Sequence, residues 1–218
     1  MIILALEFSS EQRSVAIARN GIVLGEAMEM GGRNTAALAM IEKVLAQAKM
    51  EREEIEAIAV GLGPGSYTGV RSAIALVQGW QLARGIKMTG VSSVEAIAAG
   101  AQAEKIFGRA TVIVNAQREE FYIATYEIAE TVSREITPLK IVSVADVQSL
   151  AGKGEILVGP EAAKFSPSAR VIFPHAIAVA KLVAAAGNFS ATEKLEPIYL
   201  RETTFVKAPK PPTRIISG

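Results

Sequence analysis

The sequence predicts an α/β protein in which an antiparallel meander of three strands precedes alternating helices and strands. Apolar or β-branched segments open the chain at residues 2–8, 14–19 and 22–30, and the Asn20-Gly21 pair between the last two is the strongest hairpin signal. After the third segment the apolar spacing becomes helical, and helical and strand-like segments then alternate. The opening meander distinguishes this order from a dinucleotide-binding βαβ unit.

The first half continues as three helices separated by two short strands. A 3.6-residue apolar period marks the helices and short apolar runs mark the strands. Alternating from helix to strand, they cover residues 34–49, 57–60, 70–84, 87–91 and 92–103. Gly85 follows the second helix as a glycine C-cap. Ser92, Ser93 and Glu95 are the predicted N-terminal cap of the third.

The second half is predicted to be a smaller α/β unit. Its strands are expected at residues 110–115, 121–128, 136–142 and 156–158, and its helices at 144–150 and 176–186. We place a soft boundary near residue 105, which gives subdomains at residues 1–105 and 106–205. Residues 206–218 are rich in proline and carry basic side chains, so we expect a disordered tail.

Composition indicates a soluble globular protein. Of the 218 residues, 50% are hydrophobic and 21% are charged, and a net charge of +1 gives no long-range field toward nucleic acid or an acidic membrane. The absence of cysteine excludes disulfides, thiolate nucleophiles and cysteine metal sites. No apolar run reaches the roughly 18 residues of a membrane span, so we expect a cytoplasmic protein. If the protein takes part in a reaction on RNA, we expect another protein to make the contact with the RNA.

A glycine-rich loop joins the strand at residues 57–60 to the long helix. Its residues are Gly61-Leu62-Gly63-Pro64-Gly65-Ser66-Tyr67-Thr68-Gly69. Unpaired N–H groups at a helix N-terminus favour an anion, and glycines let the backbone approach a phosphate. The loop therefore predicts a nucleotide or phosphate cradle, although a tight turn in which Ser66 and Thr68 only cap the helix explains the same residues. It is not a P-loop, because no lysine follows the last glycine.

Four segments resemble the TsaB family, which is also called YeaZ. The most specific one, similar to the glycine-loop motif of that family, is Gly63-Pro64-Gly65-Ser66-Tyr67-Thr68-Gly69-Val70-Arg71. Residues 4–10 resemble its first strand and turn, residues 90–96 the segment leading into its third helix, and residues 197–201 its C-terminal motif. The resemblance is strongest over residues 1–100. It implies the ribonuclease-H-like fold of actin, Hsp70 and sugar kinases, which agrees with the predicted strand order.

The resemblance also implies a function. The TsaB family is a catalytically silent relative of TsaD, the metal-carrying subunit that transfers a threonylcarbamoyl group to an adenosine of tRNA. TsaB pairs with TsaD, and the ATPase TsaE joins them. We therefore expect a non-catalytic subunit that supports formation of N6-threonylcarbamoyladenosine, with a TsaD-like subunit and a TsaE-like ATPase as partners. A homodimer is the alternative pairing, and tRNA is expected to be contacted only indirectly.

The same resemblance places a nucleotide or phosphate site along the first turn and the glycine loop. The residues expected there are Glu7, Ser9, Ser10, Gly63, Gly65, Ser66, Thr68 and Gly69. The sequence requires no cofactor, and ATP or ADP is the one that such a site could hold. Departures from the family pattern argue against nucleotide turnover. Glu7 replaces an aspartate that faces the nucleotide's metal in actin-like ATPases, residues 33–35 lack a histidine, and Asn115 and Gln117 remove one charge of each sign.

The long helix at residues 70–84 is apolar on two faces, and such a helix must be buried on both. Its own sheet would cover one face. We expect a partner subunit to cover the other, together with the helix at residues 34–49. The side chains expected at this interface are Leu38, Ile41, Leu45, Val70, Ile74, Val77 and Trp80. The alternative is that these are core residues of a compact monomer.

A single histidine, His175, limits the enzyme classes. It cannot form an HExxH metal pair, and nothing places it beside Ser66 for a triad, so we exclude a peptidase, expect no metal site and place His175 at a helix start. The rival enzyme is an ATP-dependent phosphotransferase of the sugar-kinase type, with Glu7 holding the metal. Such an enzyme needs a second phosphate loop, whereas Gly152-Lys153-Gly154 and Gly159-Pro160 are typical of turns.

Overall fold

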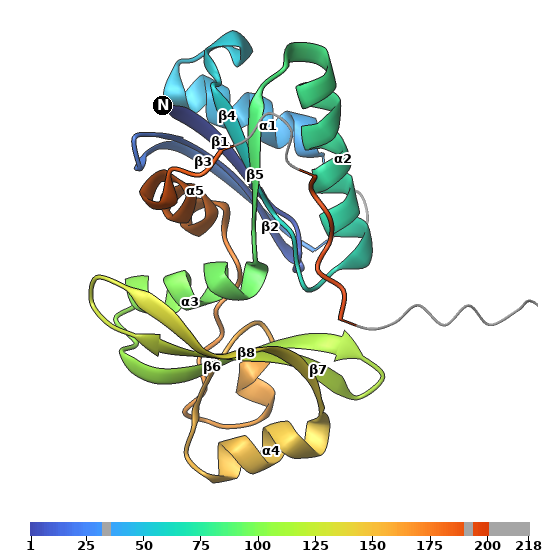
Figure 1. The fold of residues 1–218 in the computed structure, drawn as a ribbon, viewed down its shortest axis with the longest axis vertical. Helices are drawn as coiled ribbons and strands as arrows, with labels where there is room; N and C mark the ends of the chain where they lie inside the picture. The colour runs from blue at the N-terminus through green and yellow to red at the C-terminus, as the bar shows by residue number, and fades with distance from the viewer. Residues whose placement is uncertain (32–35, 190–193, 201–218) are drawn as a thin grey trace, which may run out of the picture.

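The computed structural model describes residues 1–31, 36–189 and 194–200. Its strands form two sheets at opposite ends of the molecule, with helix α3 (Ser93–Ala103) between them (Figure 1). The predicted α/β class with an actin-like, ribonuclease-H-like fold is confirmed, because an antiparallel meander is continued by parallel strands that are joined through helices. No helix in the described part of the chain is long and apolar enough to cross a membrane.

The first sheet has the strand order β3-β2-β1-β4-β5. Its strands are β1 (Ile2–Glu7), β2 (Gln12–Arg19), β3 (Ile22–Met30), β4 (Ala57–Gly61) and β5 (Lys87–Val91). Strand β1 pairs antiparallel with β2 and parallel with β4, so it lies at the centre. The β2–β3 turn at Asn20 and Gly21 has φ angles of 51° and 80°, the left-handed pair that a two-residue hairpin requires.

Helices cover both faces of this sheet (Figure 1). On one face lie α1 (Ala37–Ala48) and α2 (Tyr67–Arg84), and on the other lies α5 (Ala176–Ala186). The alternation of side chains along β1 explains the two layers, because Leu4 and Leu6 join the core under α1 and α2, whereas Ile3 and Ala5 join the core under α5. The sheet is therefore buried on both sides.

Two helices begin differently from the prediction. Helix α2 begins at Tyr67 rather than residue 70, because the Ser66 hydroxyl accepts the Gly69 N–H as an N-terminal cap, at 3.3 Å. The predicted capping box of α3 does not form, since Ser92 makes no side-chain cap and Ser93 bonds elsewhere. At the other end of α2, Gly85 is the left-handed C-cap that the sequence predicts.

The second sheet has the order β8-β7-β6-β9. Its strands are β6 (Gly108–Gln117), β7 (Glu120–Ile128), β8 (Ser133–Ser143) and β9 (Ile156–Val158). Helix α3 packs on one face and α4 (Val144–Gly152) on the other. Two short 3-10 helices, Arg52–Glu54 and Ala162–Lys164, are additions that the sequence pattern does not reveal.

Helix α5 crosses back to the first sheet, although its residues belong to the predicted second subdomain. Its N-terminus is held there by the Ser14 hydroxyl, which accepts the Ala176 N–H at 2.9 Å. His175 caps the same end, as predicted, through Nδ1, which accepts the Ile177 N–H at 3.1 Å. The division at residue 105 stays a prediction, and the predicted tail at 206–218 lies outside the described residues.

Candidate functional site

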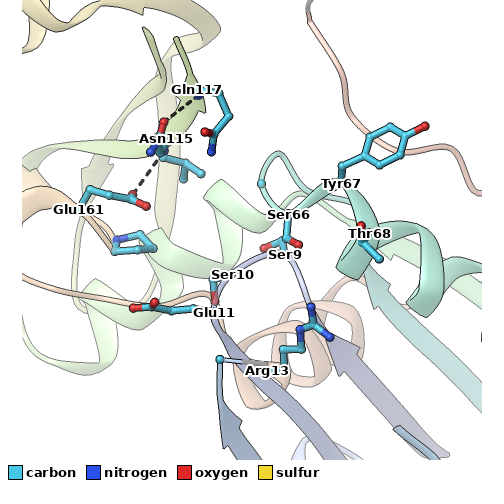
Figure 2. A pocket seen from close by; sticks show the side chains of 14 residues that line it. Ser9, Ser10, Glu11, Arg13, Ser66, Tyr67, Thr68, Asn115, Gln117 and Glu161 are labelled. Carbon is cyan, nitrogen blue, oxygen red and sulfur yellow. Dashed lines mark hydrogen bonds between the residues drawn. The ribbon is translucent and has the colours of Figure 1, made fainter. Parts of the chain in front are cut away.

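A cleft of about 650 Å³ lies between the two sheets. Its first wall comes from the β1–β2 turn, the start of β2, the end of β3 and the glycine loop, and its second wall comes from the end of β6 and the segment after β9. Residues of both walls line it: Ser9, Ser10, Glu11, Arg13, Gly31, Gly65, Ser66, Tyr67, Thr68, Val114, Asn115, Gln117, Pro160 and Glu161. Figure 2 shows the two groups of side chains facing each other.

The first wall is fixed by contact between the β1–β2 turn and the glycine loop. The Ser66 N–H donates to the Ser9 carbonyl oxygen at 2.6 Å, and the Ser10 hydroxyl donates to the Gln12 carbonyl at 2.7 Å. Gly65 has φ of 151°, and a Cβ there would lie 2.1 Å from the Ser9 carbonyl oxygen. Only glycine allows this approach, so the loop glycine serves close backbone packing.

The start of α2 adds positive potential to this wall. The first N–H groups of a helix have no acceptor within the helix, and the helix dipole adds positive potential there. Arg13, mostly buried with its guanidinium 5.9 Å from the centre of the Phe8 ring, brings a positive charge to the same wall. Ser66 itself is occupied as the helix cap.

The second wall is built from amides and a carboxylate. The Gln117 N–H donates to Asn115 Oδ1 at 2.7 Å, and the Asn115 N–H donates to Glu161 Oε2 at 3.3 Å (Figure 2). Burial is the main cause that raises the pKa of the Glu161 carboxyl, and the charge of Glu11 acts in the same direction. Such groups suit hydroxyl and amide partners, whereas the first wall suits an anion.

The structure gathers only part of the predicted nucleotide site. Ser9, Ser10, Gly65, Ser66 and Thr68 line the cleft. Glu7, Gly63 and Gly69 are buried behind the wall. Burial raises the pKa of the Glu7 carboxyl, while hydrogen bonds from Ser9 and Ser93 oppose that rise. Nucleotide or phosphate binding at this cleft stays a prediction.

The second wall holds residues that the sequence did not identify as site residues. Pro160 and Glu161 follow Gly159, which we interpreted as part of a simple turn. A Gly-Pro pair follows a short strand twice, at Gly63-Pro64 behind the first wall and at Gly159-Pro160 beside the second, and this repetition was the available signal. Asn115 and Gln117 attracted notice only as departures from a family pattern. Arg13 carries no sequence signal, because its place depends on the β1–β2 register.

The fold family implies a metal-bound nucleotide opposite residue 7, and the residues present do not fit that metal. Glu7 has no exposed surface and does not line the cleft. In the described part of the chain, no group of three His, Cys, Asp or Glu side chains could hold a metal ion. His175 is occupied as a helix cap, with its Nε2 2.8 Å from Glu26 Oε1.

The predicted partner-interface side chains divide into two groups. Five are buried in the chain's own core, which corrects their assignment to an interface: Ile41, Leu45, Val70, Ile74 and Val77. The cause is that α1 and α2 share one core over the first sheet, so the chain itself covers the second apolar face of α2. Trp80 is half-buried against that core, whereas Leu38 is 64% exposed.

The opposite side of α2 is exposed and carries two small residues, one amide side chain and one apolar side chain. Ala75, Gln78, Gly79 and Leu82 follow one another at helical spacing and form what we call the outer face of α2. Leu82 is 84% exposed. A Cβ added at Gly79 would meet no atom within 4 Å, so the helix backbone is open to close approach there.

The C-terminal motif lies beside the start of α2 (Figure 1). The Ile198 N–H donates to the Leu62 carbonyl oxygen at 2.8 Å, and Leu195 enters the core under α1 and α2. Tyr199 stacks on Tyr67 with ring centres 5.5 Å apart. This segment therefore anchors the glycine loop beside the start of α2, whereas Arg201 of the motif lies outside the described residues.

Comparison with known proteins identifies the family. The family model of TsaD, tRNA N6-adenosine threonylcarbamoyltransferase, matches residues 32–205. The chain is 29% identical to the Escherichia coli tRNA threonylcarbamoyladenosine biosynthesis protein TsaB, across 92% of this chain and 95% of that protein.

Two solved structures from Pseudomonas aeruginosa share the fold over nearly their whole length. One, described as an uncharacterized protein with similarity to peptidase YeaZ, is 28% identical with a TM-score of 0.78 and covers 92% of this chain and 99% of that chain. The other, YeaZ, is 27% identical with a TM-score of 0.77 and covers 91% and 99%. The chain therefore belongs to the TsaB (YeaZ) proteins within the family that the TsaD model describes.

Proposed function

We propose that this protein is a non-catalytic subunit that pairs with a TsaD-like subunit and supports formation of N6-threonylcarbamoyladenosine in tRNA. The observation that carries the proposal is the match to TsaB over 92% of this chain and 95% of the relative. A TsaE-like ATPase joins the pair, and tRNA is contacted through the partners. The near-neutral charge of +1 supports indirect contact with RNA.

The non-catalytic role is supported by how the ionisable side chains are used. The Glu7 carboxyl, which the sugar-kinase alternative needs for a metal, is enclosed behind the cleft wall. His175 holds the end of α5 and faces Glu26. Neither side chain is available as a metal ligand or general base at the cleft.

The outer face of α2 is the surface that we assign to the TsaD-like subunit. Small residues at Ala75 and Gly79 let a second helix approach closely, and the exposed Leu82 supplies an apolar anchor at one end. Leu38 adds an exposed apolar side chain on α1, the neighbouring helix of the same layer. These residues replace the buried ones in the predicted interface.

The test is association between the purified chain and TsaD from the same organism, by size-exclusion chromatography with light scattering. We expect a stoichiometric complex with the wild type and none with Leu82→Glu. Ile22→Glu is the matched control, because Ile22 is also an exposed apolar residue, at 69%, but lies on the β2–β3 hairpin. Full pairing by Leu82→Glu would reject this surface. A wild type that pairs with nothing and consumes ATP alone would support the phosphotransferase instead.

A further inference from the structure

The carboxyl of Glu7 lies where strand β1, strand β4, the glycine loop and helix α3 meet. The Ser9 N–H donates to Oε1 at 2.8 Å, and the Ser93 hydroxyl donates to Oε2 at 2.9 Å. Gly61, the last residue of β4, is so close that a Cβ there would lie 1.9 Å from Oε2. Both carboxyl oxygens are therefore occupied by donors or closed off by backbone.

We propose that Glu7 is a positioning residue that ties the glycine loop and the start of α3 to the end of β1, in the place where the fold family holds a metal-facing acid. A metal ion needs open coordination positions around its ligand oxygen. Here the Gly61 backbone and the Ser93 hydroxyl fill the space around Oε2. Glu7 thus supplies a hydrogen-bond acceptor inside the protein.

Ser93 extends this junction to the glycine loop. Its hydroxyl accepts the Gly63 N–H at 3.1 Å while donating to Glu7, and its own N–H donates to the Gly63 carbonyl oxygen at 2.8 Å. Three residues beyond Gly63, the Ser66 N–H is held by the Ser9 carbonyl oxygen at 2.6 Å. Glu7 therefore acts on both ends of the segment from which α2 begins.

The length of the side chain separates a positioning role from metal binding. Aspartate is shorter by one methylene, so Glu7→Asp keeps the charge of a metal ligand but cannot reach Ser93 and the Ser9 N–H together. Glu7→Gln keeps the length and one carbonyl acceptor but loses the charge that a hard cation prefers. If Glu7 is a positioning residue, Glu7→Gln should be tolerated better than Glu7→Asp. If Glu7 binds a metal, Glu7→Asp should be tolerated better than Glu7→Gln.

The experiment measures urea unfolding of the wild type, Glu7→Asp, Glu7→Gln and Ser93→Ala, each with magnesium and with a chelator. Positioning predicts that Glu7→Asp raises the unfolding equilibrium constant by about tenfold or more and that Glu7→Gln raises it less, because one or two hydrogen bonds to a charged group are lost in the shorter side chain. It also predicts no magnesium effect on any variant. Ser166→Ala, a hydroxyl loss near the protein surface, is the matched control.

A double-mutant cycle between Glu7→Leu, which removes both acceptor oxygens, and Ser93→Ala gives a second readout, because directly bonded residues show non-additive effects and separate ones do not. Additive effects would overturn the proposal. So would magnesium stabilisation of the wild type that Glu7→Asp keeps and Glu7→Gln loses. If Glu7→Asp fails to fold, the double-mutant cycle and the magnesium titration of the wild type still distinguish a positioning role of Glu7 from metal binding.

Pairing of Glu7→Gln and Ser93→Ala with TsaD is measured on the same preparations, and only this arm rests on the proposed function. We expect weaker pairing by Ser93→Ala, since the segment before α2 loses its anchor. Absent pairing by the wild type would reject the proposed function and leave the unfolding results on Glu7 intact.

Discussion

The two sides of helix α2 both carry apolar residues, but only the inner side is buried. The inner side, which includes Ala73, Ile74 and Val77, is enclosed by the first sheet and α1. The outer face carries Ala75, Gly79 and Leu82, and it is exposed. The difference shows that apolar residues on a helix do not by themselves identify an interface. Those that contact the sheet or the neighbouring helix are buried in the core of the same chain.

The largest contrast between the two sides is expected from a charge placed on each. Val77→Glu puts a carboxylate at a position with 0% exposure, so it should lower the free energy of unfolding by about 4 kcal/mol or more, or prevent folding. Leu82→Glu should change it by less than about 0.5 kcal/mol, because the side chain is at the surface. Circular dichroism during urea unfolding measures both. Equal losses would show that the outer face is also part of the core.

A methyl group at the junction behind the helix should have the next largest effect. Gly61→Ala places a Cβ against the Glu7 carboxyl, so we expect a loss of about 3 kcal/mol in the free energy of unfolding. Gly152→Ala is the control, because a Cβ there meets nothing within 4 Å. The same urea measurement applies, and a Gly61→Ala protein as stable as Gly152→Ala would mean that Glu7 can turn away freely.

The His175 cap of α5 is expected to make a smaller, pH-dependent contribution to the free energy of unfolding. Burial lowers the pKa of His175 below its ordinary value of 6.5, against the charge of Glu26, which raises it. The folded state then binds fewer protons than the unfolded state, so the free energy of unfolding should fall as the pH drops below 6.5. His175→Asn keeps a cap and cannot titrate, so it should lack that part of the pH dependence. Parallel thermal unfolding curves at neutral and mildly acidic pH compare the two proteins, and an identical pH response would contradict the account.

The smallest expected effect tests whether a partner helix approaches the outer face closely at Gly79. Gly79→Ala adds a methyl group in a helix interior where nothing is near it, so the isolated chain should gain about 0.5–1 kcal/mol. Pairing with TsaD should weaken, because the methyl group holds the partner helix away. Titration calorimetry measures the second quantity. A variant that is more stable and pairs better would show that the backbone at Gly79 is not approached closely.

Much of the fold follows from local sequence signals, and much of the site does not. The β2–β3 turn, the cap at Ser66 and the C-cap at Gly85 depend on neighbouring residues, so the sequence reveals them. The bond between Ser93 and Glu7 joins residues 86 positions apart and replaces a local cap that the sequence favoured. Long-range pairing of this kind has no periodic signature.

The two walls of the cleft illustrate the same limit. The composition of the glycine loop predicts the first wall. Asn115 and Glu161 face that wall only because α3 packs between the two sheets, and the sequence does not predict this packing. Likewise, the apolar character of Ile74 and Val77 was visible, but which surface covers them depends on where α1 lies. The sequence pattern therefore predicts that these side chains are buried, but it does not predict whether the same chain or a partner subunit covers them.

The central claim is that the outer face of α2 meets a TsaD-like subunit. The chain contains no cysteine, so a single cysteine can report the exposure of one position. We would compare the rate of thiol labelling at Gln78→Cys, on the outer face, with that at Ala163→Cys, an exposed site beyond the second sheet, before and after TsaD is added. The account predicts that TsaD slows labelling at position 78 and leaves position 163 unchanged. Equal labelling of position 78 with and without a bound TsaD would contradict it.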